Sequence, residues 1–234
     1  MMVGVVRYTL ICMVSLCIAM VSVSGQAPCT LSNVPLQQNF DIDLFLGKWY
    51  EIEWVSPAYM DAGELWINYY HVYSADEYGV VTGYYSGKDS NTAQCFLGGL
   101  AVLKSTDHPA KMLLYNEQKR KVMYDYWIVS TDYTSYAIAY GCLNRAPDSN
   151  DTCATARSWL WGRSRSLPES VKVNARTIFE SLCMNLTLLY ATGWRGDECI
   201  PDVSGFAERV NTDRVSFLFP LLTVVFVLSR SFCC

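Results

Sequence analysis

The segment NFDIDLFLGKWYEI, residues 39–52, carries a glycine two positions before a tryptophan. Gly47 lets another stretch of backbone come close, because glycine has no side chain. Trp49 supplies a large apolar ring that can plug one end of a closed sheet. The run from Lys48 to Trp54 is rich in aromatic and apolar residues, which is typical of a strand. We therefore expect a strand that begins near Gly47 and points Trp49 inward.

Seven further runs of this kind follow, and short polar turns separate them. They lie at residues 66–73, 80–85, 94–103, 111–115, 123–130, 136–141 and 153–162. Such spacing favours antiparallel strands joined by hairpins. A later apolar stripe at Val171, Ala175, Ile178 and Leu182 predicts one helix, with Ser166 as its N-cap. The predicted fold is all-β, an eight-stranded antiparallel up-and-down barrel with one C-terminal helix packed outside.

The composition excludes several classes of protein. Of the 234 residues, 51% are hydrophobic and 17% are charged, and the formal net charge is −4. A chain this apolar is not intrinsically disordered. Its mild acidity argues against a nucleic-acid partner, because binding to phosphates needs a basic face.

The N-terminus reads as a signal peptide at residues 1–25. Arg7 precedes the apolar stretch 8–23, and Val23-Ser24-Gly25 places small residues at a cleavage site. The alternative is a signal anchor that stays in the membrane. The stretch is shorter than the roughly 20 residues that a span requires, which favours removal.

The C-terminus resembles a signal for a glycosylphosphatidylinositol (GPI) anchor. Small residues near Ser204 and Gly205 precede the polar spacer 208–214 and the apolar tail 215–228. We expect the lipid on Ser204 or Gly205, with residues 205–234 removed and a barrel domain at 26–204. The alternative is a short tail anchor with palmitoylated cysteines at its end. The anchored protein would sit on the outer leaflet of the plasma membrane, and otherwise it would be secreted.

Six cysteines remain between the two ends, an even number that predicts three disulfides in a secreted chain. They are Cys29, Cys95, Cys142, Cys153, Cys183 and Cys199. No Cys-x-x-Cys spacing occurs and there are only two histidines, so we expect no metal site and no cofactor. Asn150 and Asn185 each begin a glycosylation sequon and are predicted to carry glycans.

Two further motifs accompany the Gly-x-Trp segment. Thr131-Asp132-Tyr133 follows the run that ends at Ser130, and WLWGR at residues 159–163 precedes Leu167-Pro168. With these three motifs in this order, the chain resembles the lipocalins, and within them the apolipoprotein D-like group. Its anchored form is similar to the Lazarillo type of cell-surface lipocalin.

The resemblance implies structural roles for the motif residues, which are Gly47, Trp49, Thr131, Asp132, Tyr133 and Arg163. Arg163 would lie over the Trp49 indole, and Asp132 would fix its turn by accepting backbone hydrogen bonds. The family pattern implies a Cys29–Cys142 disulfide and a displaced Cys95–Cys199 bridge. Cys153 and Cys183 are then left to pair with each other.

The resemblance also implies a small hydrophobic ligand inside the barrel, of the bilin, retinoid, sterol or fatty-acid class. Strand alternation nominates an aromatic lining, and Glu51 is a candidate anchor for a polar group. The lining candidates are Trp66, Tyr70, Tyr84, Tyr126 and Tyr140. The alternatives are that the rings fill the barrel completely and that Glu51 points into water.

The predicted function is transport or sequestration of that ligand at the cell surface. The alternative is a GPI-anchored adhesion or signalling protein of the Lazarillo type, which would have a protein partner at the cell surface. We do not expect an enzyme. The resemblance offers one enzymatic precedent that needs a thiol in the pocket, and here every remaining cysteine can be paired.

Overall fold

The computed structural model describes residues 30–56, 66–116 and 119–199. The predicted signal peptide, the anchor residues Ser204 and Gly205, and Cys29 lie outside the described residues. Of the helices in these ranges, none combines the length and the hydropathy needed to cross a membrane.

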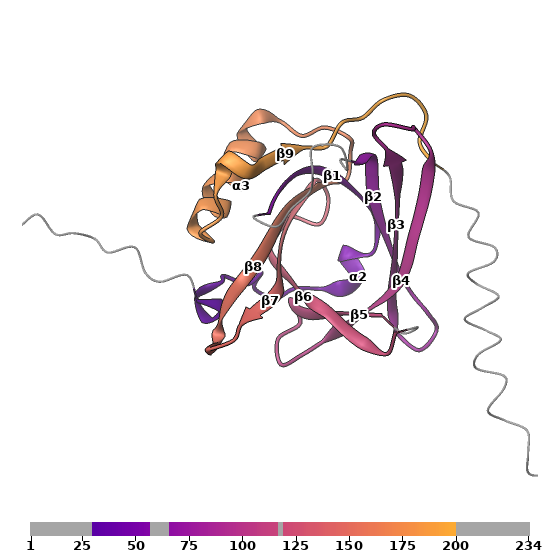
Figure 1. The fold of residues 1–234 in the computed structure, drawn as a ribbon. Coiled ribbons are helices and arrows are strands. Elements are labelled where there is room, and N and C mark those ends of the chain that lie inside the picture. Colours follow the sequence, from indigo (N-terminus) through magenta and orange to yellow (C-terminus); the bar gives the residue numbers. More distant parts are fainter. Residues whose placement is uncertain (1–29, 57–65, 117–118, 200–234) are drawn as a thin grey trace, which may run out of the picture.

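Eight long strands wind into a closed antiparallel barrel, which confirms the predicted fold (Figure 1). The strands are β1 (Gly47–Val55), β2 (Trp66–Ala75), β3 (Val81–Asp89), β4 (Cys95–Ser105), β5 (Lys111–Asn116), β6 (Lys121–Thr131), β7 (Tyr136–Ala146), β8 (Ser149–Gly162) and the short β9 (Leu189–Ala191). The helices are α2 (Ile42–Phe45) and α3 (Glu169–Ser181), with 3-10 turns at Leu31–Asn33 and Leu186–Leu188. Each long strand pairs with the next, and β1 closes the ring by pairing with both β2 and β8.

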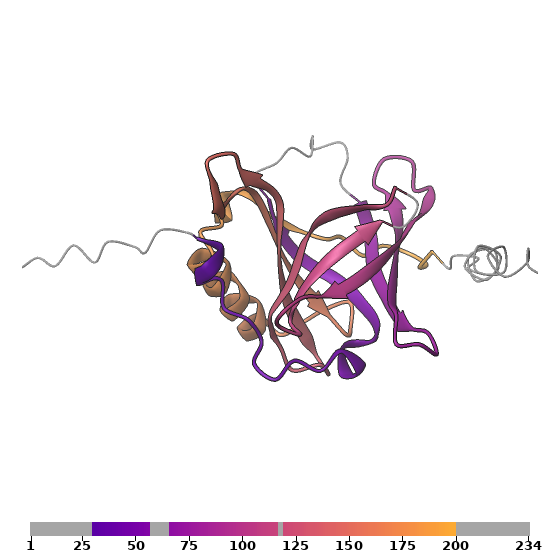
Figure 2. The same ribbon diagram turned by 90° about the horizontal axis from the view of Figure 1, so that it is seen from below.

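The core has two layers because successive side chains of a strand point to opposite faces of the sheet. One apolar cluster lies inside the barrel and includes Trp49, Trp54 and Trp161. The other lies between the outer wall and α3, which runs along the outside of the barrel (Figure 2). Ala175 and Phe179 of α3 are both fully buried in this second cluster.

Helix α3 begins later than the sequence suggests. Its N-cap is Pro168 and no side chain caps it, so the predicted Ser166 cap is wrong. Arg176 of α3 forms a salt bridge with the buried carboxylate of Glu53 on β1, which ties the helix to the wall. Glu53 faces outward because β1 has an irregular register between Glu51 and Glu53.

One end of the barrel is closed by α2 (Figure 2). The predicted contact between Trp49 and Arg163 lies at the same end. The guanidinium carbon of Arg163 lies 3.7 Å from the centroid of the Trp49 ring. Arg163 also donates to backbone carbonyls of Leu44, Lys48 and Tyr133 at 3.1, 3.0 and 2.9 Å. Gly47 has φ of +96°, and a Cβ there would lie 3.3 Å from the Arg163 side chain. Glycine at this position therefore relieves backbone strain and leaves room for the arginine.

The turn between β6 and β7 is held as expected. The Asp132 carboxylate accepts backbone hydrogen bonds from Thr134, Ser135 and Tyr136. The Tyr133 hydroxyl in turn accepts from the backbone N–H of Asp41 at 3.0 Å, just before α2. The turn and α2 thus form one connected floor with Arg163.

Two disulfides join described residues, and one of them corrects the prediction. Cys95 pairs with Cys199 as expected. Cys142 pairs with Cys153, so the predicted Cys29–Cys142 and Cys153–Cys183 bridges are wrong. The β7–β8 hairpin extends well beyond the predicted strand ends, and it brings the Cα atoms of Cys142 and Cys153 to 5.7 Å. Cys183 forms a disulfide as well.

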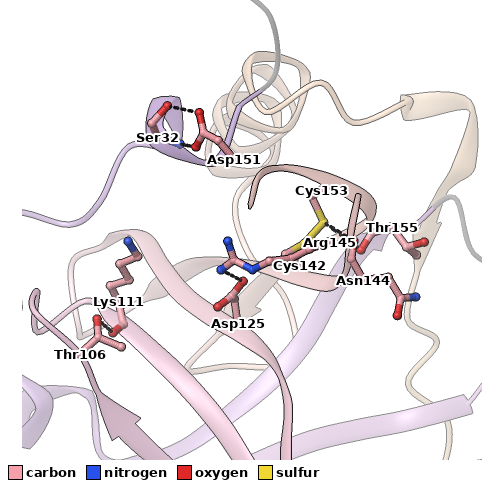
Figure 3. Close-up of polar contacts among 10 residues, drawn as sticks. All are labelled: Ser32, Thr106, Lys111, Asp125, Cys142, Asn144, Arg145, Asp151, Cys153 and Thr155. Atoms are coloured by element: carbon pink, nitrogen blue, oxygen red, sulfur yellow. Dashed lines mark hydrogen bonds and ion pairs between the residues drawn. A yellow bond between two sulfur atoms is a disulfide. The ribbon is translucent and has the colours of Figure 1, made fainter. Parts of the chain in front are cut away.

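Figure 3 shows this bridge next to a partly buried ion pair between Asp125 of β6 and Arg145 of β7. The two side chains meet at 2.7 Å. In the same hairpin, Asp151 accepts hydrogen bonds from the backbone N–H and the hydroxyl of Ser32. These contacts tie the hairpin to β6 and to the start of the described chain.

Candidate functional site

The interior of the barrel is lined by aromatic side chains with polar groups among them. Strand β8 directs Arg157, Trp159 and Trp161 inward at successive alternate positions. The facing side chains come from β1, β2, β3 and β6, and they are Trp49, Glu51, Trp54, Tyr69, His71, Tyr73, Tyr85, Tyr124 and Tyr126. Such a lining combines large apolar area with hydrogen-bonding groups.

Two of the predicted lining residues lie inside. Tyr126 is 1% exposed and packs against Tyr73 and Trp159. Glu51 is buried among the interior tyrosines. A third residue, Trp66, stands 38% exposed, where it contacts Tyr69 and Phe96.

Two predicted residues on β2 and β3 face outward, which corrects the prediction. Asn68 has φ of +55°, and the register of β2 shifts between Ile67 and Tyr70. The shift turns Tyr70 to the outer face, where its hydroxyl donates to the carbonyl of Cys199. Tyr84 is the outward neighbour of Tyr85, which contacts interior rings. A one-residue slip reverses every side chain of a strand.

Tyr140 also faces outward, into the second core. It packs against Trp127 in the cluster under α3. Its hydroxyl makes no hydrogen bond within the described part of the chain.

A hydrogen-bonded chain crosses the lower interior. It runs from Tyr69 through His71 and Tyr73 to Tyr126, with distances of 3.1, 2.7 and 3.0 Å. Burial lowers the pKa of His71 to about 3, so this imidazole is neutral at physiological pH. A neutral imidazole has one donor and one acceptor, which fits a partner on each side. These polar groups are therefore satisfied within the protein.

Glu51 lies where β1 and β2 separate. The two strands pair only along residues 47–50 of β1, and beyond that point β9 pairs with β1 instead. The Thr192 hydroxyl, just after β9, donates to Oε1 of Glu51 at 2.6 Å. Burial raises the pKa of Glu51 to about 7, although Thr192 and Arg157 both act to lower it. This carboxyl thus changes charge near neutral pH.

Arg157 is an interior charged side chain that makes no hydrogen bond to the described residues. Its guanidinium carbon lies 5.2 Å from the centroid of Trp54 and 5.8 Å from that of Trp159. Nε is buried, and among the described residues the side chain forms no hydrogen bond and no ion pair. An arginine without an acceptor inside a barrel is a candidate binding group.

A hollow of about 210 Å³ opens beside Trp54 and is called here the rim hollow. Its lining comes from β1, β2, the β3–β4 turn and the segment around β9, and consists of Trp54, Trp66, Ile67, Ser90, Tyr190, Ala191, Thr192, Gly193 and Arg195. The Trp54 ring stacks on the Tyr190 ring, with 4.7 Å between their centroids. The Arg157 guanidinium also lies over the Trp54 ring. The Trp54 ring is therefore shared, since it lines the rim hollow and also contacts Arg157.

Other predicted sites have different outcomes. The described residues hold no group of three or more His, Cys, Asp or Glu side chains that could bind a metal ion. Asn185 is exposed and caps a 3-10 turn by accepting from Thr187. Asn150 lies near the start of β8, and glycosylation at both positions stays a prediction.

Sequence reasoning missed Arg157, Tyr69 and His71. A signal for Arg157 was present, because counting back in steps of two from Trp161 places Trp159 and Arg157 on one face. No such signal existed for Tyr69 and His71, since the shift at Asn68 is not visible in the alternation.

Comparison with known proteins agrees with this architecture. Residues 46–199 match the model of the lipocalin / cytosolic fatty-acid binding protein family. Apolipoprotein D of Cavia porcellus is 29% identical over 149 residues, covering 64% of this chain and 74% of that protein. Retinol-binding protein 4-A of Oncorhynchus mykiss is 29% identical over 154 residues, covering 62% and 84%. The Lazarillo protein of Schistocerca americana is 30% identical over 147 residues, covering 62% and 66%.

Proposed function

The chain belongs to the lipocalin family, and from this premise we propose that it binds and carries a small, mostly apolar ligand inside its barrel. The observation that carries the proposal is the interior itself. Arg163 and α2 close one end, aromatic side chains from several strands fill much of the interior, and the rim hollow opens beside Trp54. An eight-stranded barrel has room for about one small ligand.

The ligand class that fits is amphipathic. Tyrosine and tryptophan rings offer apolar area, and Glu51 and Arg157 add polar groups to the same interior. Retinoids, bilins, sterols and fatty acids share this chemistry, and one similar protein is named for retinol binding. We expect affinity for at least one of these classes.

Fluorescence quenching tests the proposal directly, since Trp54, Trp159 and Trp161 all lie inside. Retinol, biliverdin, a sterol and a long-chain fatty acid are titrated into the secreted protein. We expect saturable quenching at about one ligand per chain. The same titration into urea-unfolded protein is the control. Absence of saturable quenching with every class would contradict the proposal.

The cell-surface location is a separate proposal, supported by the C-terminal signal around Ser204 and Gly205. Treatment of expressing cells with a phosphatidylinositol-specific phospholipase should release the protein. Mass spectrometry of the released C-terminal peptide would identify the modified residue. Retention on the cells after treatment would favour the tail-anchor alternative.

Adhesion or signalling remains the second candidate function, and the same C-terminal signal supports it. If adhesion is the main role, cells that display the protein should aggregate equally with and without saturating ligand. We also propose that the protein is not an enzyme. Ligand is incubated with the protein, extracted and analysed by mass spectrometry. Chemical conversion of the ligand over many turnovers would contradict this proposal.

A further inference from the structure

The position of the ligand's polar end can be inferred from Arg157, an interior cation that has no acceptor among the described residues. Arg157, Trp159 and Trp161 occupy alternate inward positions of β8, and Arg163 continues the series directly after the strand ends. Arg163 donates to several backbone carbonyls at the closed end. Arg157, toward the open end, donates to none of the described residues.

The indoles beside Arg157 attract its charge but accept none of its hydrogen bonds. Trp54 and Trp159 both lie within cation–π range, at 5.2 and 5.8 Å. The Nε–H is buried and without an acceptor, so bulk water does not satisfy it. Leaving a buried donor unsatisfied is unfavourable, and this site retains one.

Among the residues that the structure describes, no anion pairs with Arg157. Glu51 acts on it electrostatically but forms no ion pair with it, and Oε1 of Glu51 already accepts from Thr192. Tyr69, Tyr124 and Tyr126 also lie near Glu51, and burial raises the pKa of each hydroxyl, so all three stay neutral. Arg195 adds a second cation at the rim hollow.

We propose that Arg157 binds the carboxylate of an amphipathic ligand whose apolar part lies deeper in the barrel, along Trp159 and Trp161. The proposal rests on the proposed function and narrows it to acids over neutral alcohols and sterols. A guanidinium can donate two parallel hydrogen bonds to a carboxylate, and the flanking indoles hold it in place. The order of residues along β8 places the acid near the open end and the hydrocarbon toward the floor.

The test compares ligands that differ only in their head group. Retinoic acid is paired with retinol, and palmitic acid with hexadecanol, and each is titrated into the full secreted protein. Wild type should bind each acid at least about tenfold more tightly than its alcohol, in keeping with a charged hydrogen bond. Arg157→Gln should weaken acid binding about tenfold to a hundredfold and leave alcohol binding within about twofold.

Two further variants guard against trivial explanations. Arg120→Gln removes an exposed arginine from the β5–β6 hairpin and should change neither affinity. Arg157→Lys keeps the charge and should keep part of the acid preference. Thermal unfolding of each variant checks that it is folded. Should Arg157→Gln not fold, the acid preference of wild type and of Arg157→Lys still decides the question.

The outcomes separate the two proposals. If wild type binds the alcohols as tightly as the acids, or if Arg157→Gln weakens both alike, the carboxylate assignment is overturned while ligand binding stands. If wild type binds neither member of either pair, and no other class quenches its fluorescence, the proposed function fails and the assignment falls with it.

Discussion

Arg157 lies on β8, and Arg163 follows the last residue of the same strand, six positions further along the chain. Both stack on tryptophan. Arg163 is bonded to the backbone of three different segments, whereas Arg157 has no acceptor among the described residues. The comparison assigns Arg163 to stability and leaves Arg157 available for binding. An arginine that already donates to the protein would have to break those hydrogen bonds in order to donate to a ligand.

The same division holds for the interior acids and phenols. Near the floor, the Tyr69–His71–Tyr73–Tyr126 chain satisfies its own members. Nearer the rim hollow, Glu51 changes charge around neutral pH, and Arg157 has no acceptor among the described residues. Function in this barrel therefore concentrates where polar groups are incompletely paired.

The largest expected effect comes from replacing each arginine with methionine. Arg163→Met should lower the free energy of unfolding by about 3 kcal/mol or more, because several buried carbonyls lose a charged donor. Arg157→Met should change it by less than about 1 kcal/mol, since no hydrogen bond is lost. Urea denaturation of both variants measures this. Equal losses would mean that Arg157 is a structural residue.

The next effect concerns Glu51 and the pH dependence of stability. Its pKa is about 7 in the folded protein and about 4.5 unfolded, so the folded state holds the proton more tightly. The contribution of Glu51 to the free energy of unfolding is therefore fully present below pH 4.5. It is lost as the pH rises to about 7, and the loss is up to about 3 kcal/mol. Glu51→Gln should remove the part of this fall between pH 6.5 and 8, measured by urea denaturation.

A second titration, of opposite sign, overlaps only the lower end of that window. Burial lowers the pKa of His71 to about 3, so the unfolded chain takes up this proton first. Its contribution to stability is lost as the pH falls from about 6.5 to 3. An unchanged slope above pH 6.5 in Glu51→Gln would show that Glu51 is not the titrating group.

Ligand affinity should follow the same carboxyl, with a smaller effect. Once Glu51 ionises, it competes with a bound carboxylate for Arg157, so acid affinity should fall several-fold between pH 6 and 8. The other groups facing Glu51 are Thr192, Tyr69, Tyr124 and Tyr126, and the tyrosines stay neutral in this range. Retinoic acid titrations should show a flat profile in Glu51→Gln. A fall that persists in this variant would place the titration elsewhere.

The smallest effect compares two tyrosines on opposite faces of the wall. Tyr126→Phe removes the acceptor for the Tyr73 hydroxyl, which should lower the free energy of unfolding by about 1–2 kcal/mol. Tyr140→Phe removes a hydroxyl that has no hydrogen bond in the described structure, and should change stability by less than about 0.5 kcal/mol. Thermal unfolding distinguishes them. The reverse order would contradict the assignment of the two faces.

Much of this architecture was predictable from local sequence. The Gly47–Trp49 segment and Arg163 identified the closed end, because a motif fixes both residue types and their spacing. The lining was only partly predictable. Asn68 adopts a left-handed conformation that reverses the alternation of β2, and nothing in the residues before it marks the change. The Cys142–Cys153 bridge was missed because the hairpin continues through polar residues that were expected to form a turn.

The Cys95–Cys199 bridge has a mechanical consequence. Residues 189–193 lie between β1 and β2 where these two strands separate. Within this segment, the Thr192 hydroxyl donates to Glu51. Tension applied to the chain beyond residue 199 reaches β4 through the covalent bridge before it reaches this segment. The disulfide thus transfers force on the C-terminal segment to β4 and protects the pairing of β9 with β1.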